Sequence, residues 1–475
     1  MPDAVRELYS QRRYPALSHP ETHPGTLAAT ARCCGVITPP LVDSCRLLEI
    51  GCASGHNLLP LAERFPDSTF HGIDFSDSAI RAAEQAARAV GLENITFEHA
   101  DLTDWQPPEE PFDFVIAHGM LSWIPDGAKA ALLDLIPRCL AESGLASLSY
   151  NTLPGWALRH EAAAMLPALG ALDPDHQGLD ALLGTLESTA ALGGSPYSQH
   201  LAEIYRDMRR KGPAILPFDD LAPQCDAFHF GRVLGWAGER KLRYLGETSL
   251  ADNLPPNLPA EALARLKPLE KDPVLLQQAL DLLSGRAHRT SLFCPAETSI
   301  DTTTTSSVTL HFEVRLLVSK LPPEAVHGEI IGLLHAALTA AAPDTRPLTG
   351  LMEECAARLG PRWDPATGSQ AIAGWIWQAA RLGWVELRTD AIAIPSTPAK
   401  PKLSPLNLHF ARQRTGVVDA FHRTCHFPEN HRSMVAALDG TRTLDELAAL
   451  ARHEAPDLDF HPWIRHLAGR GLFVS

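Results

Sequence analysis

The sequence predicts an α/β fold: a doubly wound parallel sheet with a helical insertion, followed by two small α+β modules. Three observations support this prediction. Strand-like and helix-like segments alternate between residues 46 and 150, strand signals are missing from 157–222, and a helix–turn–strand pattern occurs twice near the C-terminus. The alternation indicates parallel strands, because each strand returns to the same edge through a helix.

Five segments in the first part have the composition and length of strands. They are RLLEI, TFHGID, ITFEHA, FDFVIAH and LASLSY, and the helices among them are HNLLPLAERF, DSAIRAAEQAARAVG and AALLDLIPRCLAESG. Two later strands lie in KLRYLGET and RTSLFCP. We expect these two to complete the edge of the first sheet; the alternative is a separate second domain.

The chain divides into three predicted parts. The boundaries are 1–299 for the first domain (with an N-terminal lid segment 1–44, the helical insertion 157–222 and a further region 223–299), 300–396 for a middle module and 397–475 for a C-terminal module. TTTTSS (302–307) and IPSTPAKPKLSP (394–405) mark the linkers. Because WIWQAARLGWVEL and WIRHLAGRGLFVS share a pattern, we expect both modules to be winged-helix-like.

Composition excludes several classes of protein. The 475 residues carry a net charge of −15, concentrated in residues 1–299, and neither small module has a basic stripe, so nucleic-acid binding is not expected. The nine cysteines include no C-x-x-C pair, which indicates free thiols and no metal site. The N-terminus lacks an apolar signal core, and no apolar run approaches the roughly 18 residues of a membrane span. We therefore expect a soluble, cytoplasmic protein.

The segment LLEIGCASGHN (47–57) reads as a strand, a glycine-containing loop and the start of a helix. Gly51 and Gly55 allow the backbone to turn tightly and to approach a ligand without an intervening Cβ. A dinucleotide site prefers G-x-G-x-x-G, but His56 stands where the last glycine would be. Glu49, just before the loop, would repel a pyrophosphate and instead suits a ligand with an ammonium group.

Acidic residues also end the next two strands. Asp74 ends TFHGID, where a carboxylate can accept hydrogen bonds from both ribose hydroxyls, and Phe75 follows it. Asp101 and Leu102 follow the third strand, where an acid can accept a hydrogen bond from an adenine amino group. A nucleoside with a charged amino-acid tail satisfies this order of groups. The predicted ligand is therefore S-adenosylmethionine.

With these motifs, residues 45–150 resemble class I S-adenosylmethionine-dependent methyltransferases, which implies a Rossmann-like sheet. The resemblance implies that Glu49, Gly51, Ala53 and Gly55 form the methionine-side loop, that Asp74 binds the ribose and that the adenine lies at Asp101 and Leu102. His118 and Phe75 are further candidate cofactor contacts. The family usually has glycine where Ala53 stands, and a methyl group fits there if φ is negative.

A narrower resemblance extends over most of the chain. YPALSHPETHP, IAHGMLSWIP, SYNTLPGW, LLSGRAHRTSLFC and LDGTRTLDELA resemble a bacterial group that carries a methyltransferase regulatory domain. The group includes protein-lysine methyltransferases that modify outer-membrane proteins. The resemblance implies that region 223–299 is of this regulatory type and that the partner is a protein presenting lysine.

The loops after the fourth and fifth strands are the candidate acceptor site. Methyl transfer is an in-line displacement, and a lysine acceptor only has to become neutral, which an apolar or aromatic channel favours. The candidate catalytic or acceptor-contacting residues are His118, Trp123, Tyr150, Asn151, Trp156 and Tyr14. The alternative is that these side chains only pack, with His118 bonded to a backbone carbonyl.

Three functions remain open from the sequence. The first is a protein-lysine N-methyltransferase, favoured because nearly half of the chain lies outside the catalytic domain. The second is an N- or O-methyltransferase for a small molecule or peptide natural product. The third is a non-catalytic scaffold that binds S-adenosylmethionine, suggested by Ala53 and by the lack of an evident base.

Overall fold

The structure is a computed structural model that describes residues 5, 7–9, 12–166, 178–254, 258–301 and 312–474. Linker residues 302–307 lie outside this part. A central sheet carries the first domain, with the strand order β3-β2-β1-β4-β5-β8-β7. Its strands are β1 Arg46–Ile50, β2 Thr69–Asp74, β3 Ile95–His99, β4 Phe112–Ala117, β5 Leu140–Thr152, β7 Leu242–Glu247 and β8 His288–Pro295, and β6 Ala227–Phe228 pairs with β5.

The two late strands join this sheet, as expected. β1 to β5 are parallel, whereas β8 runs antiparallel to both β5 and β7. The prediction that they complete the sheet is therefore confirmed, against the alternative that they belong to a separate second domain.

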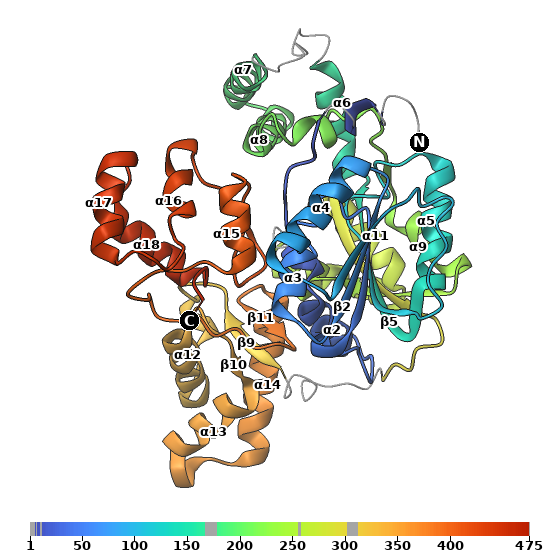
Figure 1. The fold of residues 1–475 in the computed structure, drawn as a ribbon. Helices are drawn as coiled ribbons and strands as arrows, with labels where there is room; N and C mark the ends of the chain where they lie inside the picture. Colours follow the sequence, from blue (N-terminus) through green and yellow to red (C-terminus); the bar gives the residue numbers. More distant parts are fainter. Residues whose placement is uncertain are drawn as a thin grey trace.

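The central strands are nearly continuous runs of buried residues, and successive side chains point to opposite faces, so both faces of the sheet are buried. On one face Leu47 and Phe114 pack with helices α2 Pro24–Cys33, α3 Leu59–Arg64 and α4 Asp77–Val90. On the other face Leu48 and Val115 pack with α5 Asp126–Cys139 and α9 Phe230–Glu239. Figure 1 shows these two helical layers on either side of the sheet. The doubly wound α/β prediction is confirmed.

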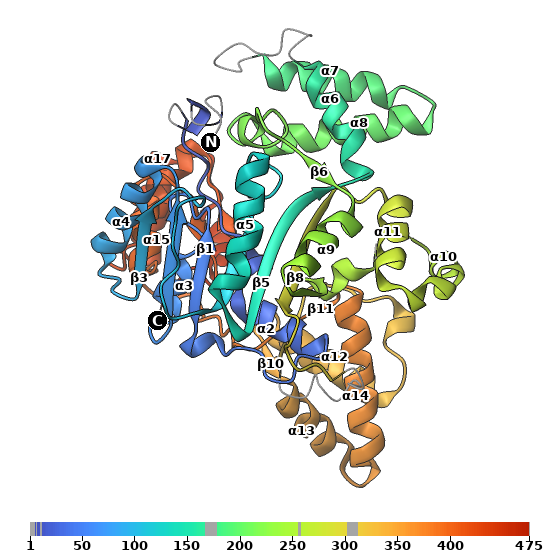
Figure 2. The same ribbon diagram turned by 90° about the vertical axis from the view of Figure 1, so that its right-hand side faces the viewer.

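A helical insertion follows β5 at the carboxyl edge of the sheet. It consists of α6 Gly155–Met165, α7 Leu179–Ala191 and α8 Pro196–Lys211, which have their own apolar core. In Figure 2 α7 and α8 lie at the top, beyond the end of β5, whereas α13 and α14 lie at the bottom. Two further helices, α10 Ala260–Arg265 and α11 Pro273–Ser284, precede β8.

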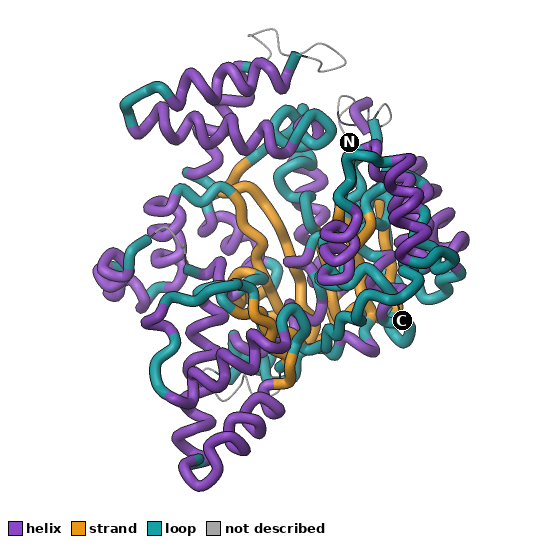
Figure 3. Tube along the Cα trace, turned by 90° about the vertical axis from the view of Figure 1, so that its left-hand side faces the viewer, coloured by secondary structure: helices purple, strands orange, loops and turns teal. Residues whose placement is uncertain are grey.

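Two small modules complete the chain. The first contains β9 Glu313–Leu316, α12 Glu329–Ala341, β10 Arg346–Pro347, α13 Leu348–Leu359, α14 Pro365–Arg381 and β11 Val385–Arg388. Its three strands form one sheet in the order β10-β9-β11. Figure 3, coloured by secondary structure, shows strands in the interior of the molecule with helices around them.

The last module packs directly on α3 and α4 of the first domain. It contains α15 Pro405–Arg412, β12 Val417–Val418, β13 Thr424–Cys425, α16 Arg432–Ala436, α17 Leu444–Glu454 and α18 Phe460–Gly469. Leu406 and Phe410 of α15 belong to the same buried apolar cluster as α3 and α4. The module is therefore continuous with the core of the first domain.

No helix in the described ranges is long and apolar enough to span a membrane.

Candidate active site

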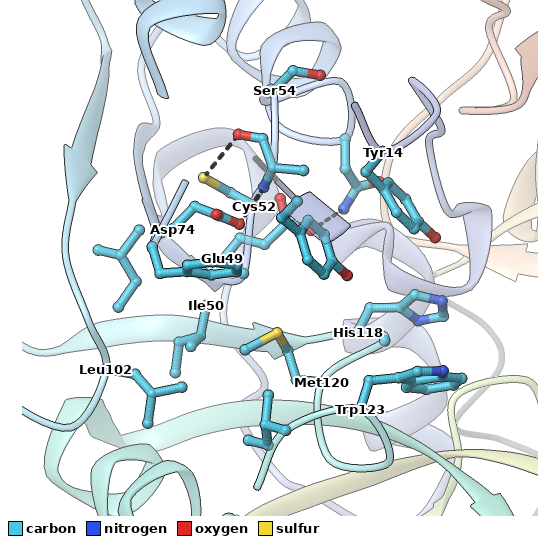
Figure 4. Close-up of a pocket in the computed structure, with 18 of the residues that line it drawn as sticks. Tyr14, Glu49, Ile50, Cys52, Ser54, Asp74, Leu102, His118, Met120 and Trp123 are labelled. Atoms are coloured by element: carbon cyan, nitrogen blue, oxygen red, sulfur yellow. Dashed lines mark hydrogen bonds between the residues drawn. The ribbon is translucent and has the colours of Figure 1, made fainter. Parts of the chain in front are cut away.

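A cavity lies at the carboxyl ends of β1, β2 and β4, where ligands bind to open parallel sheets. It encloses about 1090 Å³ of space, its open mouth included, and its lining runs from Val5 to Ala128 in the sequence. Figure 4 shows two groups of side chains facing each other across it. Glu49, Asp74 and Leu102 form the strand-tip wall, and Tyr14, His118 and Trp123 form the aromatic wall.

The loop after β1 turns with three residues in the left-handed region. Gly51 has φ of 81° and Gly55 has φ of 70°, and a Cβ on Gly55 would meet the Phe97 ring at 2.5 Å. Ala53 also has a positive φ, 46°. The condition that its methyl group requires, a negative φ, is therefore not met. The backbone of Ala53 is therefore strained, because the left-handed region costs a residue with a Cβ about 1–2 kcal/mol.

Glu49 is a buried carboxylate with one oxygen bonded and one free. Its Oε1 accepts a hydrogen bond from Asn57 Nδ2 at 2.9 Å, whereas Oε2 has no hydrogen-bond partner among the residues that the structure describes. Burial raises the pKa of Glu49 to about 7, although the bond from Asn57 opposes this shift. An unpaired buried oxygen of this kind is unfavourable unless a ligand supplies a donor.

Asp74, at the end of β2, holds the neighbouring backbone in place. Its Oδ2 accepts a hydrogen bond from the Ala53 backbone N–H at 2.9 Å, and its Oδ1 accepts one from the Ser76 N–H at 2.8 Å. Burial raises the pKa of Asp74, and the two backbone bonds oppose that shift. Phe75 follows in the cavity lining. This carboxylate therefore couples the loop after β1 to the tip of β2.

Asp101 and Leu102 line the cavity from the loop after β3. Asp101 Oδ1 accepts hydrogen bonds from the backbone N–H and the Oγ1 hydroxyl of Thr103, at 3.1 and 2.9 Å. The carboxylates predicted from three successive strand tips thus reach one cavity.

The N-terminal segment covers part of the same cavity. Tyr9, Tyr14 and His19 line it. The Tyr14 ring packs edge-on against Phe218 with centroids 5.4 Å apart, and burial raises the pKa of Tyr14 to about 12. The segment is thereby attached to the end of the helical insertion, just after α8.

His118, after β4, belongs to a cluster with two residues of the N-terminal segment. Its ring stacks on His19 with centroids 3.9 Å apart, and its Nε2 lies 3.7 Å from Glu21 Oε1. Burial lowers the pKa of His118, so its imidazole is neutral. Burial alone would raise the pKa of Glu21, but the interactions with His19 and His118 outweigh burial and lower it. The ligand atoms of these three side chains lie within 4.8 Å of one another, so the cluster could also accept a cation.

Three predicted acceptor residues lie outside the cavity lining. Tyr150 is fully buried in the core, where its hydroxyl is 3.1 Å from Ser291 Oγ, so its predicted place at the entrance is wrong. Asn151 is also buried; its Nδ2 contacts Cys225 and its Oδ1 lies 3.3 Å from His288 Nδ1. Trp156 packs beneath Arg159 and Lys211. Tyr150 and Asn151 are buried because β5 continues to Thr152 and both residues pair with β8.

Four residues at the site were not found from the sequence. Asn57 lies at the start of a predicted helix, Met120 lies in a predicted loop, and Tyr9 and Glu21 lie in the N-terminal segment. For Asn57 a signal existed, since a polar amide follows the glycine loop directly at the start of a helix. For the other three no local pattern distinguishes them from surface residues, because long-range packing brings them to the cavity.

Two family models match parts of the chain. Residues 47–144 match a methyltransferase domain, and residues 213–295 match a predicted methyltransferase regulatory domain. The fold and the cavity agree with these matches. The chain therefore carries a class I S-adenosylmethionine-dependent methyltransferase domain together with a methyltransferase regulatory domain, and S-adenosylmethionine is the cofactor of such a domain.

Individual proteins similar to the chain include an uncharacterized protein, RP789, of Rickettsia prowazekii, 29% identical over 62% of this chain and 53% of its own length. Another is the uncharacterized protein sll1526 of Synechocystis, 25% identical over 54% of this chain and 52% of its own length. The chain thus spans about half the length of these curated relatives. The solved structure of PKMT2 from Rickettsia typhi covers 97% of this chain and 100% of its own, with a TM-score of 0.83 and 20% identity. This likeness extends the shared fold over the small modules.

Proposed function

We propose that the protein transfers methyl groups from S-adenosylmethionine to lysine side-chain amines of a protein substrate. The observation that carries the proposal is the division of one cavity into the strand-tip wall and the aromatic wall (Figure 4). Acidic groups suit a cofactor with an ammonium tail and hydroxyls. Aromatic rings and neutral imidazoles suit an amine that must lose its proton and its water.

The residues of the strand-tip wall fit the cofactor. The unpaired Oε2 of Glu49 offers an acceptor to the cofactor's ammonium group, and Gly51 and Gly55 allow the tight turn beside it. Asp74 would accept hydrogen bonds from the ribose, with Phe75 beside it. Asp101 and Leu102 would hold the adenine. When bound, S-adenosylmethionine supplies an electrophilic methyl group on a sulfonium.

The aromatic wall would prepare the acceptor. Tyr14 and Trp123 offer ring faces to a lysine ammonium and to its methylated forms. The same apolar surroundings destabilise the charged amine and favour the neutral, nucleophilic form. His118 lies between these rings (Figure 4) and is neutral, because burial lowers its pKa. Its Nδ1 has no hydrogen-bond partner among the described residues and would accept a hydrogen bond from the amine, whereas its Nε2 lies 3.7 Å from Glu21 Oε1.

The other parts of the chain would present the substrate. The helical insertion is the best placed of them, because it follows β5 and lies beyond the carboxyl edge of the sheet (Figure 2). Tyr9 and Tyr14 both pack on Phe218, just after α8. The likeness in fold to PKMT2 of Rickettsia typhi supports a protein substrate. Cytoplasmic location stays a prediction.

A labelling experiment tests the proposal. The full chain is incubated with methyl-labelled S-adenosylmethionine and a bacterial lysate, and the products are separated by size. We expect label in protein bands and, by peptide mass spectrometry, on lysine. Label only in small molecules would overturn the lysine assignment in favour of a small-molecule methyltransferase. Cofactor binding without any labelled product would indicate a non-catalytic scaffold.

A further inference from the structure

One asparagine connects the cofactor loop to two distant parts of the chain. Asn57 Nδ2 donates to Glu49 Oε1 at 2.9 Å and lies 3.1 Å from the Thr22 hydroxyl, to which it also donates. Asn57 Oδ1 accepts from the His19 backbone N–H at 2.8 Å and lies 2.8 Å from His422 Nε2. Asn57 is buried, and all the hydrogen-bonding capacity of its amide is used. We call these five residues the Asn57 hub.

The orientation of this amide follows from chemistry. The His19 backbone N–H can only donate, so the atom that it reaches must be the amide oxygen. His422 Nε2 contacts the same oxygen and must therefore carry a proton. Burial and the nearby positive charge lower the pKa of His422 to about 3, so the ring is neutral with that one proton. The amide nitrogen is then left for Glu49 and Thr22, and its orientation cannot reverse without losing two bonds.

The position of Glu49 depends on this arrangement. The bond from Asn57 holds Oε1 and leaves Oε2 without a partner among the described residues, in a side chain that lines the cavity. A carboxylate held in one orientation needs no rearrangement when a cation binds, which favours affinity.

His422 reaches Asn57 from the C-terminal module through an unusual backbone. Its φ is 60°, in the left-handed region that is strained for a residue of this kind. The turn is fixed by Asp419, whose Oδ1 accepts from the N–H groups of Phe421 and Arg423 at 2.9 and 2.8 Å. Arg470 Nε donates to Asp419 Oδ2 at 2.8 Å, which ties the turn to the end of α18. The strained backbone is thus that of His422, the residue by which the C-terminal module joins the Asn57 hub.

The same module is attached to the cofactor loop at a second point. His56, next to Asn57, stacks on Phe410 with centroids 4.0 Å apart, and its Nε2 lies 2.8 Å from the Gly416 carbonyl oxygen. His56 and Asn57 follow the glycine loop directly. The C-terminal module therefore contacts the loop through two adjacent side chains, of which only Asn57 bonds to Glu49.

We infer that His422 of the C-terminal module is a positioning residue of the cofactor site, acting through Asn57 on Glu49. The inference rests on the part of the proposed function that gives Glu49 to the cofactor. His19 and Thr22 of the N-terminal segment also bond to the amide of Asn57. Cofactor binding, packing of the N-terminal segment over the cavity and packing of the C-terminal module therefore stabilise one another. Such coupling is reciprocal.

Calorimetric binding of S-adenosylhomocysteine to the full chain tests this role. His422→Phe keeps a ring and removes the donor, and we expect the dissociation constant to rise about tenfold, the effect of disturbing one hydrogen bond to a charged group. The control is His431→Phe in the same module, whose Nε2 contacts Asp457 outside the hub. The control should bind like the wild type. A dissociation constant for His422→Phe within twofold of the wild type overturns the inference.

Two further variants separate positioning from folding. His422→Asn relieves the backbone strain but is too short to reach Asn57, so we expect weaker binding without a lower melting temperature. In an Asn57→Ala background, His422→Phe should change the dissociation constant by less than a further twofold, because the bond from Asn57 to Glu49 is already missing. Additive effects would show that His422 acts by another route and would overturn the inference. If the wild type fails to bind S-adenosylhomocysteine, the proposed function itself fails instead.

Discussion

Glu49, Asp74 and Leu102 reach the cavity from the tips of neighbouring strands. On the other side Tyr14 of the N-terminal segment meets His118 and Trp123, which lie in the loop after β4. The strand-tip wall is built by register: parallel strands place the residues that follow them at one edge. The aromatic wall depends on how the N-terminal segment packs over that edge. The difference teaches that a local pattern locates the cofactor side of this cavity, and that long-range packing decides the acceptor side.

Asp74→Ala is expected to have the largest effect on the strand-tip wall. It removes the proposed ribose acceptor and the bonds to the Ala53 and Ser76 N–H groups. Two lost hydrogen bonds to a charged group predict a rise in the dissociation constant of S-adenosylmethionine of about 100-fold or more, measured by calorimetry. Asp77→Ala, which removes only an exposed pair with Arg81, is the control. Unchanged binding by Asp74→Ala would mean that the ribose lies elsewhere.

A pair of tryptophan variants tests the aromatic wall. Trp123→Ala should lower the labelling rate about tenfold or more with little change in cofactor affinity, because it removes one ring face from the acceptor side. Trp156 lies outside the cavity, so Trp156→Ala should lower the free energy of unfolding by about 3–5 kcal/mol and leave turnover per folded molecule unchanged. Turnover and denaturant unfolding are measured on both variants. The reverse pattern would move the acceptor site toward α6.

The pH dependence of cofactor binding tests Glu49. The ionised carboxylate is the form that binds an ammonium group, and the pKa of Glu49 is about 7 because the group is buried. Affinity should therefore rise as the pH increases through 7, by about tenfold between pH 6 and 8. Asp74, Asn57 and His19 face Glu49 and are the other groups that influence this titration. Glu49→Gln should bind more weakly and lose this dependence; a dependence that persists would assign the titration to another group.

Ala53→Gly should have the smallest effect. Glycine relieves the strain of φ 46°, and the greater freedom of glycine in the unfolded chain offsets part of the gain. We expect the free energy of unfolding to rise by up to about 1 kcal/mol, with cofactor affinity changed by less than about threefold. Ala82→Gly, inside α4, should instead lower it by about 1 kcal/mol. A destabilised Ala53→Gly variant would show that the methyl group contributes packing that outweighs the strain.

The residues of the two walls also differ in how far the sequence predicts them. Glu49, Gly51, Gly55 and Asp74 follow from a strand, a glycine loop and an acidic strand end. His118 and Trp123 follow from the rule that loops after parallel strands meet. Tyr150 was misplaced because the end of β5 could not be read from the sequence: the strand continues to Thr152 and is covered by β8.

The sequence by itself determined the doubly wound sheet, the late strands at its edge and the carboxylates at three strand tips. These features depend on periodicity and on residues close together in the chain. Only the tertiary structure decided that Glu21 lies beside His118 and that His422 meets Asn57, 365 residues away. Contacts between such distant residues form when buried apolar faces pack together, and no local pattern of residues encodes which polar groups then meet.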